Sequence, residues 1–165
     1  MSNAFQLEKV QVALTPLERF EEFLQSRRMR MTQQRRQIVD EVFSRHEHFN
    51  ADELCDLLGR SSAGRVSRPT VYRTLKELEE AGLLRKMNLA GRRVYEHDYG
   101  YPQHDHLYCE KCEKLIEFHS EEVARIREAV AREHHFRPSG HRLIITGLCS
   151  ECARAKRRPR RLELV

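Results

Sequence analysis

Two pairs of cysteines constrain the fold of this chain more than any other feature. Cys109 and Cys112 form the first Cys-x-x-Cys pair, and Cys149 and Cys152 form the second. Such a turn presents two thiolates to one ion, and two turns complete the tetrahedral sulfur shell of a structural Zn²⁺ site. The pairs are separated by 36 residues, more than the usual spacing of roughly 15–20. We therefore expect an intervening helix and strand that bring the two pairs together.

Disulfides and a thioredoxin-like redox pair are the competing uses of these cysteines. The redox motif belongs at the start of a helix after a strand, and neither pair has that setting clearly. The first residues lack a basic segment followed by an apolar one, and no run approaches the roughly 18 apolar residues of a membrane helix. We therefore expect a cytoplasmic protein with no membrane partner, whose thiols stay reduced and favour metal. Cys55, among leucines, is expected to be a buried core thiol.

The first hundred residues predict several helices followed by a hairpin. Apolar side chains recur at helical spacing, and Thr32, Asn50 and Ser67 or Arg68 are suitable N-caps. The expected helices cover residues 17–29, 33–44, 51–58 and 69–82, and the expected strands cover 83–89 and 92–97. This order is typical of a winged helix-turn-helix domain; the alternative is a small α+β domain without a ligand.

The fourth helix has the pattern of a recognition helix. Val71, Leu75 and Leu78 lie on one side, whereas the opposite side carries polar residues near the helix start. An exposed arginine there can read guanine, and a tyrosine can pack on thymine or bond a phosphate. The residues assigned to this face are Tyr72, Arg73 and Lys76; Arg68 and the wing residues Arg85, Lys86, Arg92 and Arg93 are assigned to phosphates. The alternative is an ordinary solvated face.

Total charge does not decide between these alternatives. The formal net charge is +5, but residues 153–165 alone carry six Lys or Arg against one Glu. The remaining chain is therefore neutral, and a nucleic-acid interface must be inferred from where the charges lie.

A second, smaller α/β domain follows. Residues 104–109, 114–118 and 141–149 predict strands, and residues 120–135 predict a helix with Val123, Ile126 and Val130 on its inner face. His104 and His106 share one face of a strand, with Glu117 on its neighbour, and imidazole with carboxylate suits Fe(II), Mn(II) or Zn(II). A metal-dependent hydrolase is an alternative, but no nucleophile, base and oxyanion donors cluster in the sequence. We therefore expect no enzyme and no small-molecule substrate.

Three segments carry a resemblance to a known family. "RPTVYRTLKELEEAGL", "HDHLYCEKCEKLIEF" and "GHRLIITGLCSEC" resemble the ferric uptake regulator family, in order, over about residues 15–153. The resemblance implies a homodimeric, metal-dependent transcription repressor that binds double-stranded DNA at A/T-rich inverted repeats. It places structural Zn(2+) on the four cysteines and a regulatory Fe(2+) between the domains, with Mn(2+) or Zn(2+) as substitutes. The regulatory ligands it implies are His48, Glu96, His104, His106 and Glu117.

The resemblance also implies a further metal site and DNA contacts. An additional metal site falls on Gln103, Asp105, Ala124 and His141, with His119, Glu121 or Glu122 as substitute ligands. Tyr72 and Arg73 correspond to base readers and Arg30 to a minor-groove contact. Two glutamates, Glu96 and Glu117, favour iron sensing; Asp98 leaves a peroxide sensor as an alternative, beside zinc or manganese sensing. A zinc or metal-storage protein without metal-dependent DNA binding is the alternative from another class.

The predicted fold class is α+β. We expect an N-terminal extension at 1–14, a winged-helix DNA-binding domain at 15–98 and a hinge at 99–103. A metal-binding dimerisation domain at 104–153 and a basic, disordered tail at 154–165 complete the prediction.

Overall fold

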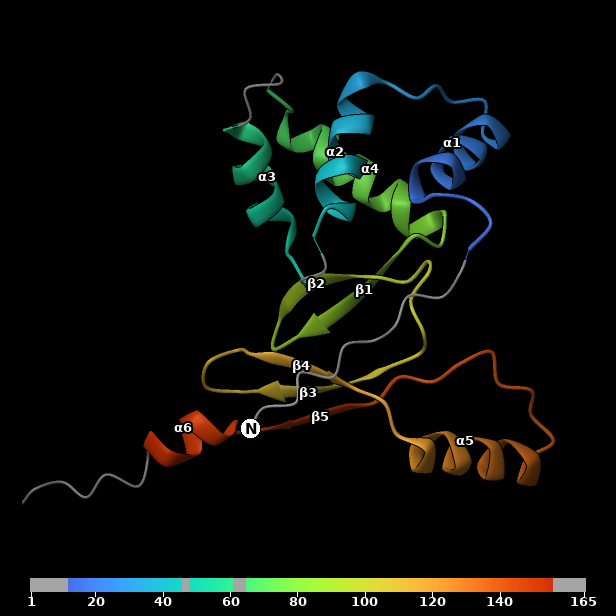
Figure 1. The fold of residues 1–165 in the computed structure, drawn as a ribbon, viewed down its shortest axis with the longest axis vertical. Helices are drawn as coiled ribbons and strands as arrows, with labels where there is room; N and C mark the ends of the chain where they lie inside the picture. Colours follow the sequence, from blue (N-terminus) through green and yellow to red (C-terminus); the bar gives the residue numbers. More distant parts are fainter. Residues whose placement is uncertain (1–11, 46–47, 61–64, 156–165) are drawn as a thin grey trace, which may run out of the picture. The chain divides into compact units, whose positions relative to one another are not determined.

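The computed structural model describes residues 12–45, 48–60 and 65–155, and the chain divides into two units. The first unit ends at Pro102 and the second begins at Gln103. Helices and two small sheets make the fold α+β, as the sequence predicts (Figure 1). No helix in the described ranges is long and apolar enough to cross a membrane. Most of residues 1–14 and of the predicted tail lie outside the described residues.

Four capped helices build the first unit. They are α1 (Pro16–Ser26), α2 (Gln33–Phe43), α3 (Ala51–Gly59) and α4 (Arg68–Glu80). Thr32, Asn50 and Ser67 cap α2, α3 and α4 as predicted, each accepting a backbone N–H of the first turn. α1 is shorter than the predicted 17–29, because Arg28 adopts a left-handed φ of 57° and cannot continue the helix.

A hairpin follows α4 and forms the wing. β1 (Leu84–Leu89) pairs antiparallel with β2 (Arg92–His97). Ala90 and Gly91 at the turn have φ of 48° and 82°, and two successive positive φ values match a type I′ hairpin turn. The loop before α3 is attached to this wing by an isolated bridge between Phe49 and Tyr95, with N–O distances of 3.2 and 2.8 Å.

The core of the first unit lies beneath α4. Val71, Leu75 and Leu78 on α4 have no exposed surface and pack with buried residues of the other helices and the hairpin. Burial of this stripe leaves the other side of α4 facing solvent, as its helical spacing predicts. The hydrophobic core thereby fixes which side chains α4 presents outward.

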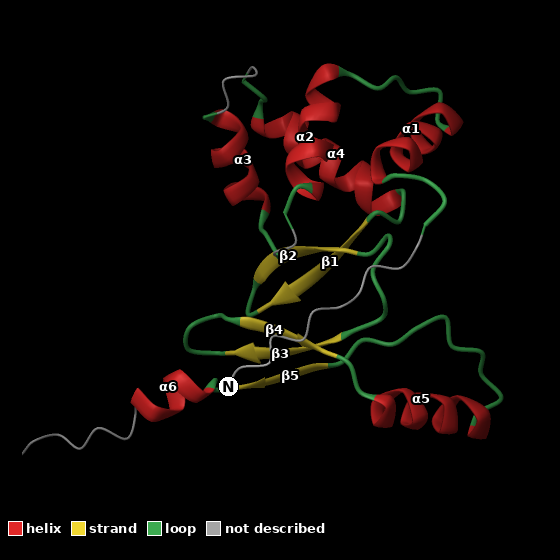
Figure 2. Ribbon diagram, in the orientation of Figure 1, coloured by secondary structure: helices red, strands yellow, loops and turns green. Residues whose placement is uncertain are grey.

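The second unit is a three-stranded sheet with two helices (Figure 2). Its elements are β3 (Asp105–Cys109), β4 (Leu115–Phe118), α5 (Glu121–Glu133), β5 (Ile144–Gly147) and α6 (Ser150–Ala155). The strand order is β4-β3-β5, with β4 antiparallel and β5 parallel to β3. β5 is shorter than the predicted 141–149, and α6 was not predicted.

The apolar face of α5 differs from the prediction. Ile126 and Val130 were expected on an inner face, but they are 63% and 50% exposed within this chain. The sheet has a similar row, because Leu107 on the central strand is paired with Ile116 and Ile145, and all three are exposed. This unit therefore has apolar surface that its own chain does not cover.

Candidate metal centres and nucleic-acid interface

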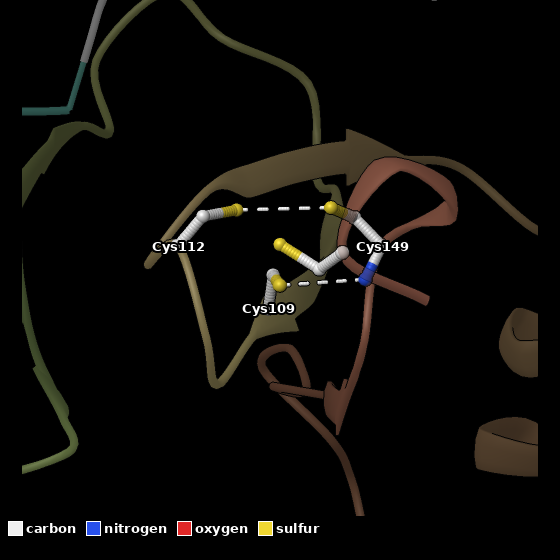
Figure 3. Close-up of side chains that lie close together, drawn as sticks. Cys109, Cys112 and Cys149 are labelled. Carbon is white, nitrogen blue, oxygen red and sulfur yellow. Dashed lines mark hydrogen bonds between the residues drawn. The ribbon is translucent and has the colours of Figure 1, made fainter. Parts of the chain in front are cut away.

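The four cysteines meet where the β3–β4 turn faces the start of α6 (Figure 3). Their sulfur atoms all lie within 4.8 Å of one another. Cys112 Sγ lies 3.7 Å from Cys149 Sγ, too far for a disulfide and close to the about 3.8 Å between two sulfurs bound tetrahedrally to one Zn²⁺. All four are free thiols, so the donor set fits a zinc ion.

Backbone donors tune this cluster. The amide of Cys149 donates to Cys109 Sγ at 3.3 Å, and such hydrogen bonds lower the pKa of Cys109 to about 6. Hydrogen bonding with the Cys149 side chain, together with burial, raises the pKa of Cys152 to about 12. These backbone donors therefore favour the thiolate of Cys109, which is the form that binds a metal ion.

The second unit groups imidazole and carboxylate at one end of its sheet. The rings of His104 and His106 lie 4.9 Å apart, as alternation along a strand predicts. Glu117 is the strand partner of His106, and its Oε1 lies 3.9 Å from His104 Nε2. His106 is buried, with 2% of its surface exposed.

The first unit carries its own imidazole–carboxylate pair. His48 Nε2 lies 3.5 Å from Glu96 Oε2. Glu96 is on β2 and 5% exposed, and the bridge from Phe49 to Tyr95 holds the adjacent loop against the same strand. Two residues further, Asp98 forms an ion pair with Arg85 at 2.5 Å. The winged-helix unit therefore holds one nitrogen donor, from His48, and one oxygen donor, from Glu96, that a divalent cation could bind.

The residues assigned to an additional metal site include only two strong metal donors, Asp105 and His141. Asp105 Oδ2 lies 3.0 Å from His141 Nε2, and its Oδ1 accepts from the Leu143 amide. The Gln103 amide donates to the His141 carbonyl at 2.6 Å, and Ala124 has no donor. Arg127 approaches the other ring nitrogen of His141 at 3.4 Å, and a guanidinium there opposes a cation.

The substitute ligands named for that site are directed elsewhere or lie on the surface. Glu121 is exposed, and Glu122 bonds Ser120 and Arg125. His119 Nδ1 lies 3.4 Å from the Gln103 carbonyl. The hydrogen bond between Asp105 and His141 therefore connects β3 to the segment that enters β5.

The outward face of α4 presents the polar residues expected for DNA contact. Tyr72 is 43% exposed, and Arg73 and Lys76 are exposed beside it. Asp52 at the start of α3 accepts a hydrogen bond of 2.9 Å from the Tyr72 hydroxyl and pairs with Arg68. The hydrogen bond to Asp52 raises the pKa of Tyr72. Sequence reasoning missed Asp52, because its partners lie on another helix.

A largely buried ion pair connects α4 to α2. Arg35 on α2 binds Glu77 through two contacts of 3.0 and 2.7 Å and also donates to the Arg30 carbonyl at 2.6 Å. The Arg35 side chain is only 15% exposed, so it is engaged inside the unit and is not a surface charge open to DNA. Arg35 and Glu77 are 42 positions apart, so no local spacing in the sequence marks this pair.

The basic residues of the wing divide into two groups. Lys86 is 3.2 Å from Glu79 and Arg85 is held by Asp98, so both charges are matched within the unit. Arg92 and Arg93 at the turn are exposed. Arg92 and Arg93 are more exposed than Arg85 and Lys86, and phosphate contact by these four residues stays a prediction.

Comparison with known proteins gives a consistent result. Residues 26–146 match the ferric uptake regulator family. A ferric uptake regulation protein of Campylobacter upsaliensis is 34% identical over 139 residues, which cover 82% of this chain and 88% of that protein.

Solved structures share the fold. A ferric uptake regulator of Helicobacter pylori, described with three functional metal-binding sites, aligns with a TM-score of 0.77 at 22% identity, covering 89% of this chain and 97% of its own. A zinc-bound manganese uptake regulator aligns at 0.59 with 38% identity, covering 79% and 98%. A zinc uptake regulator complexed with zinc and DNA aligns at 0.56 with 25% identity, covering 87% and 98%.

Proposed function

This chain belongs to the ferric uptake regulator family, and from that membership we propose that it is a dimeric, metal-responsive transcription repressor. It binds A/T-rich inverted repeats in double-stranded DNA when Fe(II) is bound. Tyr72, Arg73 and Lys76 contact bases or the adjacent backbone, and Arg30, Arg68 and the wing turn add contacts. The DNA complex of the related zinc uptake regulator supports this use of the fold.

The observation that carries the proposal is the His48–Glu96 pair inside the winged-helix unit. A DNA-reading unit has no need of an imidazole paired with a buried carboxylate for contact with DNA. The sheet of the second unit contains the complementary set, His104, His106 and Glu117. We propose that the two sets complete one regulatory site.

Metal binding and DNA binding are coupled because the proposed ligands of one ion belong to both units. When bound, the ion supplies only a positive centre that nitrogen and oxygen donors of both units share. Because those donors can be satisfied together in one arrangement of the units, binding shifts the population toward it. The spacing of two recognition helices in a dimer then depends on the metal. The Asp105–His141 pair is not part of the proposed regulatory site.

Zinc and dimerisation have separate support in the second unit. The four-cysteine cluster fits a permanent Zn²⁺ that holds the β3–β4 turn against α6. The exposed row Leu107, Ile116 and Ile145, together with α5, offers the apolar surface that a second copy of the chain would cover. We propose that this unit dimerises and that the metals serve regulation and structure, not catalysis, in the cytoplasm.

The test is selection from a random-sequence DNA pool under anaerobic conditions. Zinc-loaded protein is incubated with Fe(II), Mn(II), Zn(II) or chelator, and the bound DNA is sequenced. An A/T-rich inverted repeat enriched with Fe(II) at the lowest free concentration supports the proposal. Enrichment at lower free Mn(II) or Zn(II) assigns the protein to another metal. Equal enrichment after chelation would show that DNA binding is not metal-dependent, as expected for a metal-storage protein.

A further inference from the structure

Arg85 contacts the two acidic residues at the end of the wing. It lies on β1 directly opposite Glu96 on β2. Its Nη2 is 2.5 Å from Asp98 Oδ1, and its Nε is 4.0 Å from Glu96 Oε1. One guanidinium therefore lies between a proposed metal ligand and a second carboxylate two residues along the chain.

The two carboxylates differ in environment. Glu96 has a side chain 5% exposed and also approaches His48, whereas the Asp98 side chain is 37% exposed. Either group is a suitable oxygen ligand for a divalent cation. The shorter contact of Arg85 is with Asp98, so the guanidinium forms a direct ion pair there and only a longer approach to Glu96. Both carboxylates thus have partners in this unit, and Arg85 holds Asp98 by the shorter of its two contacts.

We propose that Arg85 determines the donor set of the regulatory site, by holding Asp98 in an ion pair and leaving Glu96 to the metal. The inference rests on the proposed function, because it concerns the site to which Glu96 contributes. Arg85 is a positioning residue with no contact to the ion. It also sets the metal affinity, because a fixed positive charge beside Glu96 opposes a second cation.

Loss of Arg85 has two consequences. Removal of its charge tightens binding of a divalent cation. Release of Asp98 supplies an additional oxygen ligand, which changes the coordination of the bound ion. The second effect depends on Asp98, whereas the first does not, so the two can be separated by substitution.

Co(II) reports both quantities in the full-length, zinc-loaded protein. Its affinity is measured by titration, and the intensity of its ligand-field absorption reports coordination number. The variants are Arg85→Gln, Asp98→Asn and the double variant. Lys86→Gln is the matched control, because Lys86 is the next residue on β1, carries the same charge and pairs with Glu79 instead of a proposed ligand. Circular dichroism confirms that each variant is folded.

Arg85→Gln is expected to bind Co(II) roughly three- to ten-fold more tightly and to show altered ligand-field bands. The double variant is expected to regain the wild-type bands, and Asp98→Asn and Lys86→Gln are expected to leave them unchanged. Unaltered bands in Arg85→Gln, or altered bands in Asp98→Asn, would overturn the inference, as would equal affinities of Arg85→Gln and Lys86→Gln. If the wild-type protein takes up no Co(II) beyond its zinc site, the proposed regulatory site itself is wrong.

Discussion

Asp52 holds two side chains that are assigned to DNA. The Tyr72 hydroxyl and the Arg68 guanidinium both contact its carboxylate, which resembles a phosphate in charge and hydrogen-bonding capacity. Asp52→Asn is expected to tighten binding to a random-sequence duplex roughly three- to ten-fold, because DNA no longer competes with Asp52. The slope of log K against log salt should steepen by about 0.9, from one further phosphate contact.

Asp56→Asn is the control for this change. Asp56 lies on the same helix, and its carboxylate is 4.0 Å from Arg68, so the substitution alters the same net charge with a weaker contact. Fluorescence anisotropy across a salt series measures both variants. Equal behaviour of the two would show that net charge, and not the contacts of Asp52, limits DNA affinity.

The cysteine cluster predicts how zinc uptake depends on pH. Cys152, with a pKa raised to about 12, is a thiol near pH 7, whereas Cys109, lowered to about 6, is mostly a thiolate. Metal binding requires thiolates, so uptake at pH 7 must displace the proton of Cys152. At pH 5 Cys109 is protonated as well, and about one more proton per zinc is released.

Zinc affinity therefore falls as the pH falls, and more steeply below about pH 6. Calorimetry of the zinc-free protein in buffers of different ionisation heat measures the number of protons released. A release that does not change between pH 7 and pH 5 would contradict the assignment of Cys109 as the preformed thiolate.

At the scale of elements, the Arg35–Glu77 pair fastens α4 to α2. Its side chains are 15% and 10% exposed, so Arg35→Met leaves a buried carboxylate without its cation. We expect this change to lower the free energy of unfolding of the first unit by about 2–4 kcal/mol, and Arg35→Met/Glu77→Met to recover most of it. Urea denaturation measures both.

Arg36→Met is the matched change on the same helix. The Arg36–Glu21 pair is 48% and 35% exposed, and its loss should cost less than about 1 kcal/mol. A comparable loss from the two single variants would mean that burial does not distinguish the pairs.

Elements with local signals were predicted well. The caps Thr32, Asn50 and Ser67 mark helix starts because their side chains bond the chain a few residues away. Elements defined by distant partners were not. β5 is short because the residues before it are engaged with Asp105 and Gln103, and α6 is too short to show a helical period.

The same distinction applies to the candidate site. The Cys-x-x-Cys spacing and the alternation of His104 and His106 are local patterns, so sequence reasoning identified these donors. Asp52 contacts residues of another helix, and Arg85 contacts Asp98 across the hairpin. No regular spacing in the sequence marks these pairs. Their roles required the packed structure.

At the scale of the whole molecule, a second copy is expected to cover the apolar row on the sheet. Ile145→Glu places a charge in that row beside Leu107 and should convert the dimer to monomer at micromolar concentration. Thr146→Glu is the control, because it is the next residue on β5 and points to the opposite face. Sedimentation measures both; a dimer that survives Ile145→Glu would place the interface elsewhere.

We expect two metal ions per protomer. The Asp105–His141 pair is closed by hydrogen bonds, and Ala124 and Gln103 offer no strong ligand. Metal analysis after dialysis should find one zinc and one exchangeable ion. Gln103→His/Ala124→Glu supplies the two ligands that the family pattern implies and should add a third ion; a third ion in the unaltered protein would contradict this reading.

The bridge between Phe49 and Tyr95 has a mechanical consequence. It ties the loop that carries His48 to the middle of the wing, a short distance from Glu96. Because of these two hydrogen bonds, a displacement of His48 would be transmitted to the strand that carries Glu96. A ligand bound by His48 and Glu96 would therefore also affect the position of Arg92 and Arg93 at the turn of the same hairpin.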